Sequence, residues 1–435
     1  MTSSDLFTPI FVPDAVGDAV SGRAWVQAML DAEAALAAAE ARAGVIPSAA
    51  AEAIAACCDA SGFDVEALAR EARDSGNPVV PLVRALTERV EGSASGYVHW
   101  GATSQDVLDT AAMLVARRAL EPIGAELDAV AAICATLADG HRTTLMAGRT
   151  LMQQALPTSF GLKAAGWLLA LVRARRRLGA LRLPVELGGA AGTLASLGER
   201  GLAVLRAMAE ELDLAEPKLP WHSDRTAVAE LGTALALTAG ALEKVALDVV
   251  LMAQTEVGEL AEASGDGRGG SSTMPHKQNP VGSTRARACA PRVRAAAGLL
   301  LEAMAGEHER AAGAWHSEWG ALGDALAFTG GAAAAVHEAL EGLEVHPDRM
   351  RENLERTAGL LLTERVTMTL AERIGRSEAK RIVEGAVAGS GSLRERLLAT
   401  DQLTEEEVDR ALDPGGYLGS ADAFIGRALE AYRSG

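Results

Sequence analysis

The segment 270–280, GSSTMPHKQNP, carries the side chains with the clearest capacity for chemistry in this chain. Ser271 and Ser272 supply hydroxyls, Lys277 supplies a positive charge and Asn279 supplies an amide. The closing Asn-Pro pair is typical of a helix N-cap followed by its first turn. Backbone N–H groups at such a helix start favour an anion. The segment therefore suits binding of a carboxylate and transfer of the proton beside it.

A serine is a poor base in water, so Ser271 or Ser272 could act only as an alkoxide held by N–H donors and a cation in a closed site. The glycine-rich residues before them supply mobility for closure. The alternative interpretation is an inert Gly/Ser connector. The MPHKQNP tail argues against it, because a connector has no need for a specified Pro, Lys and helix start.

Two further segments place polar side chains where a helix begins. In 99–106, HWGATSQD, Gly101 permits a turn and Thr103 or Ser104 can cap the next helix. Their hydroxyls, with the neighbouring amide, could hold a carboxylate. An ordinary N-cap beside a buried Trp100 is the open alternative.

The segment 148–154, GRTLMQQ, offers a second set of donors. Arg149 presents a fork that can bind a carboxylate through two hydrogen bonds. Thr150 and Gln153 are three residues apart, which is one turn if the stretch is helical. Taken alone, this segment is a weak indication of a binding site.

Long amphipathic helices must position these segments. Apolar residues between 228 and 260 follow a 3.6-residue repeat, which predicts a helix of about 35 residues, roughly 50 Å long. The ranges 106–138 and 157–181 repeat the pattern, interrupted only by Pro122. Residues 24–43 form a shorter helix that stops at glycine, and 61–77 a weaker one.

The expected fold is all-α with three domains, at 1–105, 106–350 and 351–435. Convincing strand alternation is absent from the sequence. The long central helices have Ala- and Gly-rich faces that need partner helices to cover them. The expected architecture is a long central bundle completed by other copies of the chain.

Composition excludes several classes of partner. A net charge of −17 argues against nucleic acid and anionic membranes, since no basic excess displaces counterions. It still allows a small anionic substrate, for which a few clustered donors suffice. No apolar run is long enough to span a bilayer and no signal peptide is visible, so we expect a soluble, cytoplasmic protein.

Metal and hydrolase motifs are also missing from the sequence. The four cysteines lack CxxC spacing, which argues against a disulfide framework and a zinc site. The eight histidines form no HExxH pattern, and GxSxG is absent. His222, His308 and His316 are expected to be core or rim residues, and we expect no metal ligands.

Together, GSSTMPHKQNP, HWGATSQD and GRTLMQQ resemble the three signature blocks of the fumarase/aspartase superfamily, in the family's order. The resemblance implies a homotetramer built on a twenty-helix core, with each active site shared among three subunits. It implies no metal or organic cofactor and a small carboxylate substrate. The implied chemistry is proton transfer beside a carboxylate through an aci-carboxylate intermediate, with β-elimination or the reverse addition.

The same resemblance assigns roles to residues. The catalytic base corresponds to Ser271, with Ser272 beside it as the second candidate. The residues that the resemblance assigns to binding of substrate carboxylates come from all three blocks: Thr103, Ser104, Thr150, Gln153, Lys277 and Asn279. His99 and Arg149, within the same blocks, are further substrate-binding candidates.

Other segments are similar to the cycloisomerase branch of the superfamily, which closes 3-carboxy-cis,cis-muconate to 4-carboxymuconolactone in the β-ketoadipate pathway of aromatic catabolism. These are PWH at 220–222, QTEVGEL at 254–260 and HERAAGAWHSEW at 308–319. Arg225, after PWH, becomes a candidate ligand for an extra carboxylate. Leu151 stands where the adenylosuccinate lyases carry a histidine general acid. A lactonising enzyme does not protonate a departing amine, so this loss fits the cycloisomerase branch.

Gln278 departs from the family, whose members usually carry arginine there. Losing that charge beside Lys277 would weaken attraction for a tricarboxylate. A carbon–nitrogen lyase that releases an amine, ammonia or nitrite from a substituted succinate to give fumarate, like adenylosuccinate lyase or nitrosuccinate lyase, therefore stays open. A non-catalytic helical scaffold is the third possibility, although Ser271, Lys277 and Asn279 are intact.

Overall fold

The computed structural model describes residues 4–263, 269–270, 274 and 277–434. Most of these residues are helical, and the contacts divide the chain into two compact units. The first unit comprises Met1–Leu127, Ala174–Glu243 and Arg285–Ala335, and the second comprises Asp128–Arg173, Lys244–Thr284 and Val336–Gly435. The three-domain division expected from the sequence stays a prediction.

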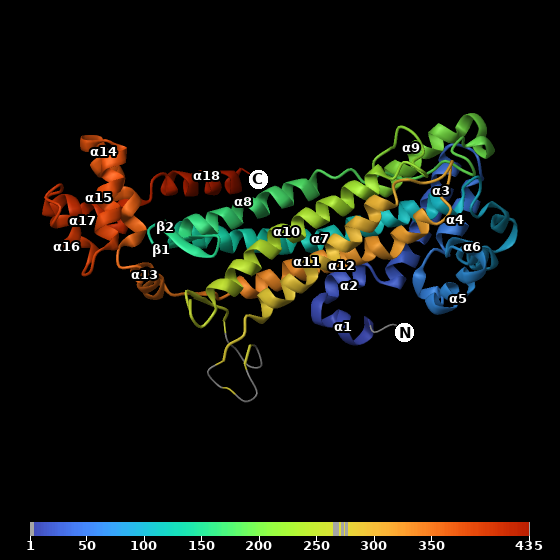
Figure 1. The fold of residues 1–435 in the computed structure, drawn as a ribbon. Coiled ribbons are helices and arrows are strands. Elements are labelled where there is room, and N and C mark those ends of the chain that lie inside the picture. The colour runs from blue at the N-terminus through green and yellow to red at the C-terminus, as the bar shows by residue number, and fades with distance from the viewer. Residues whose placement is uncertain (1–3, 264–268, 271–273, 275–276, 435) are drawn as a thin grey trace. The chain divides into compact units, whose positions relative to one another are not determined.

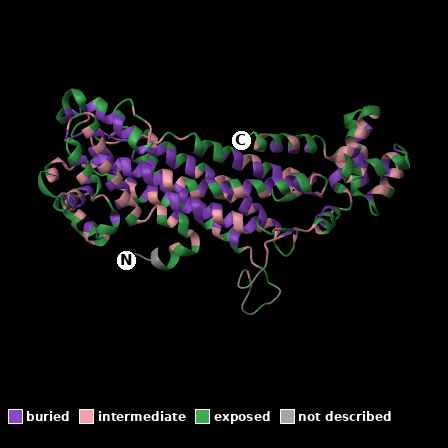
Figure 2. Ribbon diagram, turned by 180° about the vertical axis from the view of Figure 1, so that it is seen from behind, coloured by how far each residue is buried: buried purple, intermediate pink, exposed green. Residues whose placement is uncertain are grey.

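Five long helices have residues in both units (Figure 1). They are α7 (Ser104–Gly140), α8 (Phe160–Gly179), α10 (Thr226–Met252), α11 (Val281–Glu302) and α12 (Ala314–Leu340). Buried residues run along these helices in Figure 2, as expected when each helix covers an apolar stripe of its neighbours. Among the described residues, no helix combines the length and the apolar character needed to cross a membrane.

The remaining helices of the first unit lie entirely within it. They are α1 (Ser4–Phe11), α2 (Asp14–Ala19), α3 (Gly22–Arg42), α4 (Ser48–Ala55), α5 (Val65–Ser75), α6 (Val79–Arg89) and α9 (Gly201–Leu212), with 3-10 turns at Ala60–Gly62, Gly92–Tyr97 and Ala195–Arg200. The helix expected at 24–43 is confirmed as α3, and Gly44 follows it with a φ of 70°. The weaker helix expected at 61–77 is confirmed as α5, which begins after Asp64 and ends before Gly76.

The second unit adds smaller helices and four strands. These helices are α13 (Pro347–Glu355), α14 (Thr363–Ile374), α15 (Arg376–Ala388), α16 (Leu393–Leu398), α17 (Glu405–Ala411) and α18 (Ala421–Arg433), with 3-10 turns at Leu360–Leu362 and Pro414–Tyr417. Helices α14 to α17 share a small apolar core that includes Val366, Leu370, Leu397 and Val408. This core holds the C-terminal part of the chain together.

The chain is mostly helical, as expected, but β1 (Leu145–Thr150) and β2 (Gln153–Ser159) form an antiparallel hairpin that the sequence did not predict. A second short pair joins β3 (Leu260–Ala261) to β4 (Glu344–Val345). The β1–β2 register shifts between Gly148 and Arg149. Cross-strand pairing, which a short sequence pattern does not reveal, decides the conformation here.

Two expected helix boundaries also need correction. Helix α10 ends at Met252, and Leu260 belongs to β3, because the chain turns between Gln254 and Gly258. Pro122 does not interrupt α7, which continues to Gly140. A proline removes one backbone donor and crowds the preceding turn. Complete burial of the next apolar positions, Ile123 and Leu127, offsets that cost.

Candidate active site

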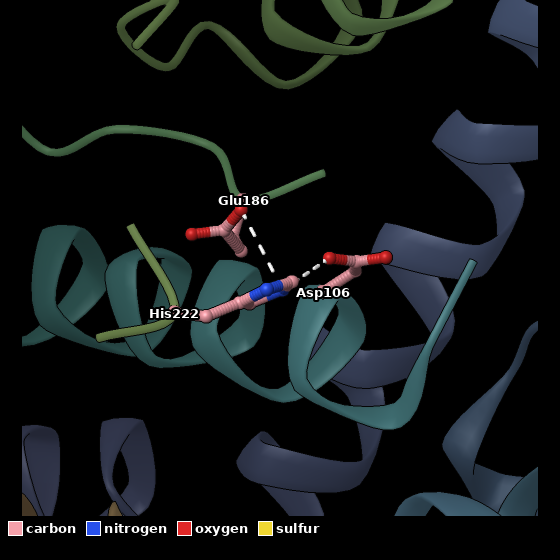
Figure 3. A group of neighbouring side chains, drawn as sticks. All are labelled: Asp106, Glu186 and His222. Atoms are coloured by element: carbon pink, nitrogen blue, oxygen red, sulfur yellow. Dashed lines mark hydrogen bonds and ion pairs between the residues drawn. The ribbon is translucent and has the colours of Figure 1, made fainter. Parts of the chain in front are cut away.

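Asp106, in the first turn of α7, is the centre of a buried cluster in the first unit (Figure 3). Its carboxylate accepts hydrogen bonds from the backbone N–H groups of Thr103 at 2.9 Å, Gly188 at 2.9 Å and Gly189 at 3.0 Å. His222 Nε2 lies 2.7 Å from Oδ1 and donates the fourth. These bonds fix the turn that carries Thr103 and Ser104 against the glycine-rich segment after residue 186.

Glu186 lies on the other side of His222, with its Oε1 3.7 Å from Nε2 (Figure 3). Its Oε2 accepts the backbone N–H of Trp221 at 2.6 Å. Burial, followed by the charges of Asp106 and Asp109, raises the pKa of Glu186 well above its usual range.

Asp106, Glu186 and His222 offer ligand atoms within 4.8 Å of one another, a spacing that a metal ion could bridge. However, Asp106 already accepts four hydrogen bonds, which is the full capacity of a carboxylate. A metal would have to displace these donors. The arrangement favours a hydrogen-bonded structural cluster over a metal centre.

Arg225 is buried next to this cluster and is bound by two carboxylates of the chain. Its Nη1 and Nη2 donate to Asp109 at 2.7 and 3.0 Å, and its Nε and Nη2 donate to Glu318 at 3.0 and 2.6 Å. Burial would lower the pKa of Arg225, but Asp109 and Glu318 outweigh it and raise the pKa. The guanidinium expected to bind a substrate carboxylate is thus saturated by internal partners.

The other candidate site residues of the first unit lie at or just before the N-terminus of α7. Ser104 is the first residue of that helix, and the Thr103 hydroxyl accepts a hydrogen bond from Arg310 at 2.8 Å. His99 has a φ of 58°, and its Nδ1 lies 2.6 Å from buried Glu33. Burial lowers the pKa of His99, but Glu33 reverses the effect and raises it. Trp100 is 44% exposed, so the alternative with a buried tryptophan is wrong.

In the second unit, Arg149 on β1 holds an internal carboxylate. Its two terminal nitrogens lie 2.9 and 2.6 Å from the oxygens of fully buried Glu259. Asn353 also donates to Glu259, at 2.9 Å. Arg149 thus makes a two-bond fork with a carboxylate of the chain itself, and its role as a substrate ligand stays a prediction.

Thr150 and Gln153 pair across the end of the β1–β2 hairpin and are both exposed. The helical turn considered for them is wrong. Leu151 and Met152 form the tip with φ values of 49° and 68°, and their exposed fractions are 96% and 74%. The hairpin therefore presents a hydroxyl, an amide and two apolar side chains at one solvent-facing point.

The candidate base residues Ser271 and Ser272 lie outside the described residues. Among the described neighbours, Lys277 is exposed, and both N–H and Nδ2 of Asn279 donate to the carbonyl of Gly269, at 2.9 and 3.1 Å. The expected helix start is confirmed at Val281. The anion bound at this helix start is a side chain of the chain itself. The Glu262 carboxylate accepts the backbone N–H groups of Gly282 and Ser283 at 3.0 and 2.9 Å.

Sequence reasoning missed several residues that build these surroundings, including Asp109, Glu186, Glu259, Glu318 and Arg310. Most are carboxylates whose partners are more than 90 residues away in the chain, so local patterns carry no signal for them. Arg310 lies within HERAAGAWHSEW, which the sequence had singled out as a segment. His222 is buried, as expected, whereas His308 and His316 are exposed.

Comparison with known proteins gives consistent matches. Residues 13–295 match the lyase family model, and residues 359–428 match the model of the adenylosuccinate lyase C-terminus. The chain is 47% identical to the 3-carboxy-cis,cis-muconate cycloisomerase of Bradyrhizobium diazoefficiens over 441 residues, which cover 98% of each chain. It is also 47% identical to the nitrosuccinate lyase of Streptomyces davaonensis over 451 residues, 99% of this chain and 95% of that one.

The fold agrees with these matches. The crystal structure of the 3-carboxy-cis,cis-muconate lactonizing enzyme from Pseudomonas putida superimposes with a TM-score of 0.92 at 42% identity and covers 99% of both chains. The sequence matches and the structural match thus point to the same family over nearly the whole length of the chain. The chain belongs to the lyase family of the fumarase/aspartase superfamily.

Proposed function

We propose that the chain is a cycloisomerase that interconverts 3-carboxy-cis,cis-muconate and 4-carboxymuconolactone. One observation carries the proposal: cycloisomerases match this chain at 35 to 47% identity over almost the full length, in both sequence and structure. Leu151, exposed at the hairpin tip where the adenylosuccinate lyases carry a histidine acid, supports it. Lactone formation has no amine leaving group for such an acid to protonate.

The reaction is an isomerisation between the acid forms; the ionised substrate takes up one proton as one of its carboxylates becomes the lactone. A carboxylate oxygen of the substrate attacks a carbon of the diene and forms a C–O bond. A proton is added to the neighbouring carbon, beside another carboxylate. In the reverse direction that proton is removed through an aci-carboxylate, and the C–O bond breaks.

Ser271 is the proposed catalytic residue that transfers this proton, with Ser272 as the alternative. The proposed carboxylate ligands are Thr103, Ser104, Thr150, Gln153, Lys277 and Asn279. The exposed hydroxyl and amide at the hairpin end and the exposed charge of Lys277 support their availability to a ligand. Arg149 and Arg225 are better explained as residues that hold the site's framework, since both bind internal carboxylates.

A substrate screen tests the proposal. The purified protein should remove the diene absorbance of fresh 3-carboxy-cis,cis-muconate and form a lactone that nuclear magnetic resonance identifies. Boiled protein is the control for spontaneous closure. If the diene persists, the proposal is wrong.

Nitrosuccinate lyase activity is the second candidate, because the nitrosuccinate lyase match reaches the same 47% identity. Gln278 favours it further, as the loop has one positive charge fewer for a tricarboxylate. The discriminating readout is release of nitrite and fumarate from nitrosuccinate. Release without loss of the muconate diene would replace the first proposal by the second.

The proposed assembly is a homotetramer with active sites shared among subunits. Exposed apolar side chains on the long helices support association, because single chains seldom leave such positions uncovered along one element. They include Leu237 on α10 and Leu299 and Leu301 on α11, with exposed fractions of 51%, 43% and 50%. These positions are the proposed contacts between copies.

A further inference from the structure

Both arginines that the sequence assigned to substrate carboxylates are occupied within the chain. Arg149 binds Glu259, and Arg225 binds Asp109 and Glu318. In such a pair the guanidinium charge is neutralised, and most of its N–H donors are bonded to carboxylates of the chain. The proposed substrate carries three carboxylates, which leaves room for a further cation besides Lys277.

Arg310 has a different environment in the first unit. One terminal nitrogen donates to the Thr103 hydroxyl at 2.8 Å and to the carbonyl oxygen of Ala190 at 3.2 Å. Within the described ranges, these are its hydrogen-bond partners, and neither is charged. Its Nε is buried and has no hydrogen-bond partner in the same part of the chain.

A buried, unpaired guanidinium donor costs free energy unless a ligand satisfies it. Arg310 therefore differs from Arg149 and Arg225 in the property that matters for binding an anion. Its full positive charge and at least one donor are still available. They lie directly beside Thr103, which the superfamily resemblance assigns to a substrate carboxylate.

The loop that carries Arg310 is held in one conformation. The backbone N–H of Ala312 donates to the Glu307 carboxylate at 2.9 Å, a bond that lowers the pKa of Glu307. Ala311 is buried, and His308 has a φ of 51°, which is unusual for a residue other than glycine. The guanidinium itself is held by its hydrogen bonds to Thr103 and Ala190.

We infer that Arg310 is a specificity-determining residue that binds one carboxylate of the substrate together with the Thr103 hydroxyl. The inference rests on the proposed function and names a binding residue that the three sequence blocks do not contain. The planar guanidinium and the hydroxyl together offer the donors that a carboxylate accepts.

Steady-state kinetics of Arg310→Gln, Arg310→Lys and Arg310→Ala with 3-carboxy-cis,cis-muconate test the inference. Arg310→Gln should raise KM about 10- to 100-fold, the loss typical of a charge-assisted hydrogen bond, while kcat stays within about threefold. Arg310→Lys should recover part of the loss. Added guanidinium at millimolar concentration should partly rescue Arg310→Ala. The matched control is Arg206→Gln, an exposed arginine paired with Glu216 in the same unit, which should behave as wild type.

Two results would overturn the inference: an unchanged KM in Arg310→Gln, or a KM increase with a lowered melting temperature and no rescue by guanidinium. Failure of the proposed function is distinguishable, because it shows as a wild-type protein without turnover. Calorimetric titration with tricarballylate, a stable tricarboxylate, then decides. Weaker binding by Arg310→Gln than by wild type supports a carboxylate site, and equal binding contradicts it.

Discussion

Arg225 gives the sharpest prediction at the scale of single residues, because it neutralises two buried carboxylates. Arg225→Gln leaves Asp109 and Glu318 without their charged partner, and such a loss typically costs about 3–5 kcal/mol. Chemical denaturation should show a decrease of this size in the free energy of unfolding. A variant of normal stability with a raised KM would instead restore Arg225 as a substrate ligand.

Glu40 predicts a pH dependence of stability. It is fully buried on α3, neither carboxylate oxygen has a hydrogen-bond partner in the described chain, and burial followed by the charge of Glu33 raises its pKa from 4.5 to about 8. Between these values the folded chain keeps a proton that the unfolded chain loses. The stabilisation from neutral Glu40 is therefore complete below pH 4.5 and is lost by about pH 8, at about 1.4 kcal/mol per pH unit.

Urea denaturation at pH 5.5 and pH 8.5 measures this effect. Glu40→Gln should lose less stability than wild type between the two conditions, because glutamine stays neutral. Glu211→Gln, an exposed position on α9, is the control and should follow wild type. Equal pH dependence in wild type and Glu40→Gln would show that Glu40 does not hold a proton in the folded chain.

At the scale of elements, the tip of the β1–β2 hairpin has an unfavourable backbone conformation. Leu151 and Met152 both have positive φ, which two-residue hairpin turns usually assign to Asn and Gly. The double substitution Leu151→Asn, Met152→Gly should raise the free energy of unfolding by about 1–3 kcal/mol. It should lower turnover, because the retained strain and exposure indicate that this apolar tip serves the site.

Calorimetric melting and initial rates check this prediction together. Leu219→Asn, at an exposed leucine outside the hairpin, is the control for loss of an apolar surface group. A more stable double variant with full activity would show that the tip has no functional role. An unchanged melting temperature would show that the positive φ values carry little strain.

The hairpin also marks the limit of prediction from sequence. Helical periodicity predicted α3, α5, α7, α8 and α10, since an apolar stripe is a local property. The partners of Arg225 lie 116 and 93 residues away in the chain. The pairing of Thr150 with Gln153 and the end of α10 at Met252 depend on backbone hydrogen bonding that apolar periodicity does not show. The three segments that carry the site residues could therefore be predicted from the sequence. The carboxylates that pair with Arg149 and Arg225 could not.

At the scale of the whole molecule, the proposed tetramer predicts a mass of about 180 kDa, four copies of 45.0 kDa, in size-exclusion chromatography with light scattering. Shared sites predict more. Co-expression of Ser271→Ala and Thr150→Ala chains should restore part of the activity that each lacks alone, because mixed tetramers contain some intact sites. A monomer, or mixed tetramers without activity, would contradict the shared-site assembly.

The most direct measurement of the central claim is the rate at which the diene absorbance of 3-carboxy-cis,cis-muconate disappears with wild-type and Ser271→Ala protein. We expect rapid loss with wild type and a rate lower by at least about 10²-fold with Ser271→Ala, the scale of a lost proton-transfer group. The rates of two further variants are compared with that of Ser271→Ala: Thr150→Ala, at a proposed site residue, and Arg206→Gln, at an exposed control position. Diene that survives wild-type protein, or a Ser271→Ala variant that matches it, would contradict the account.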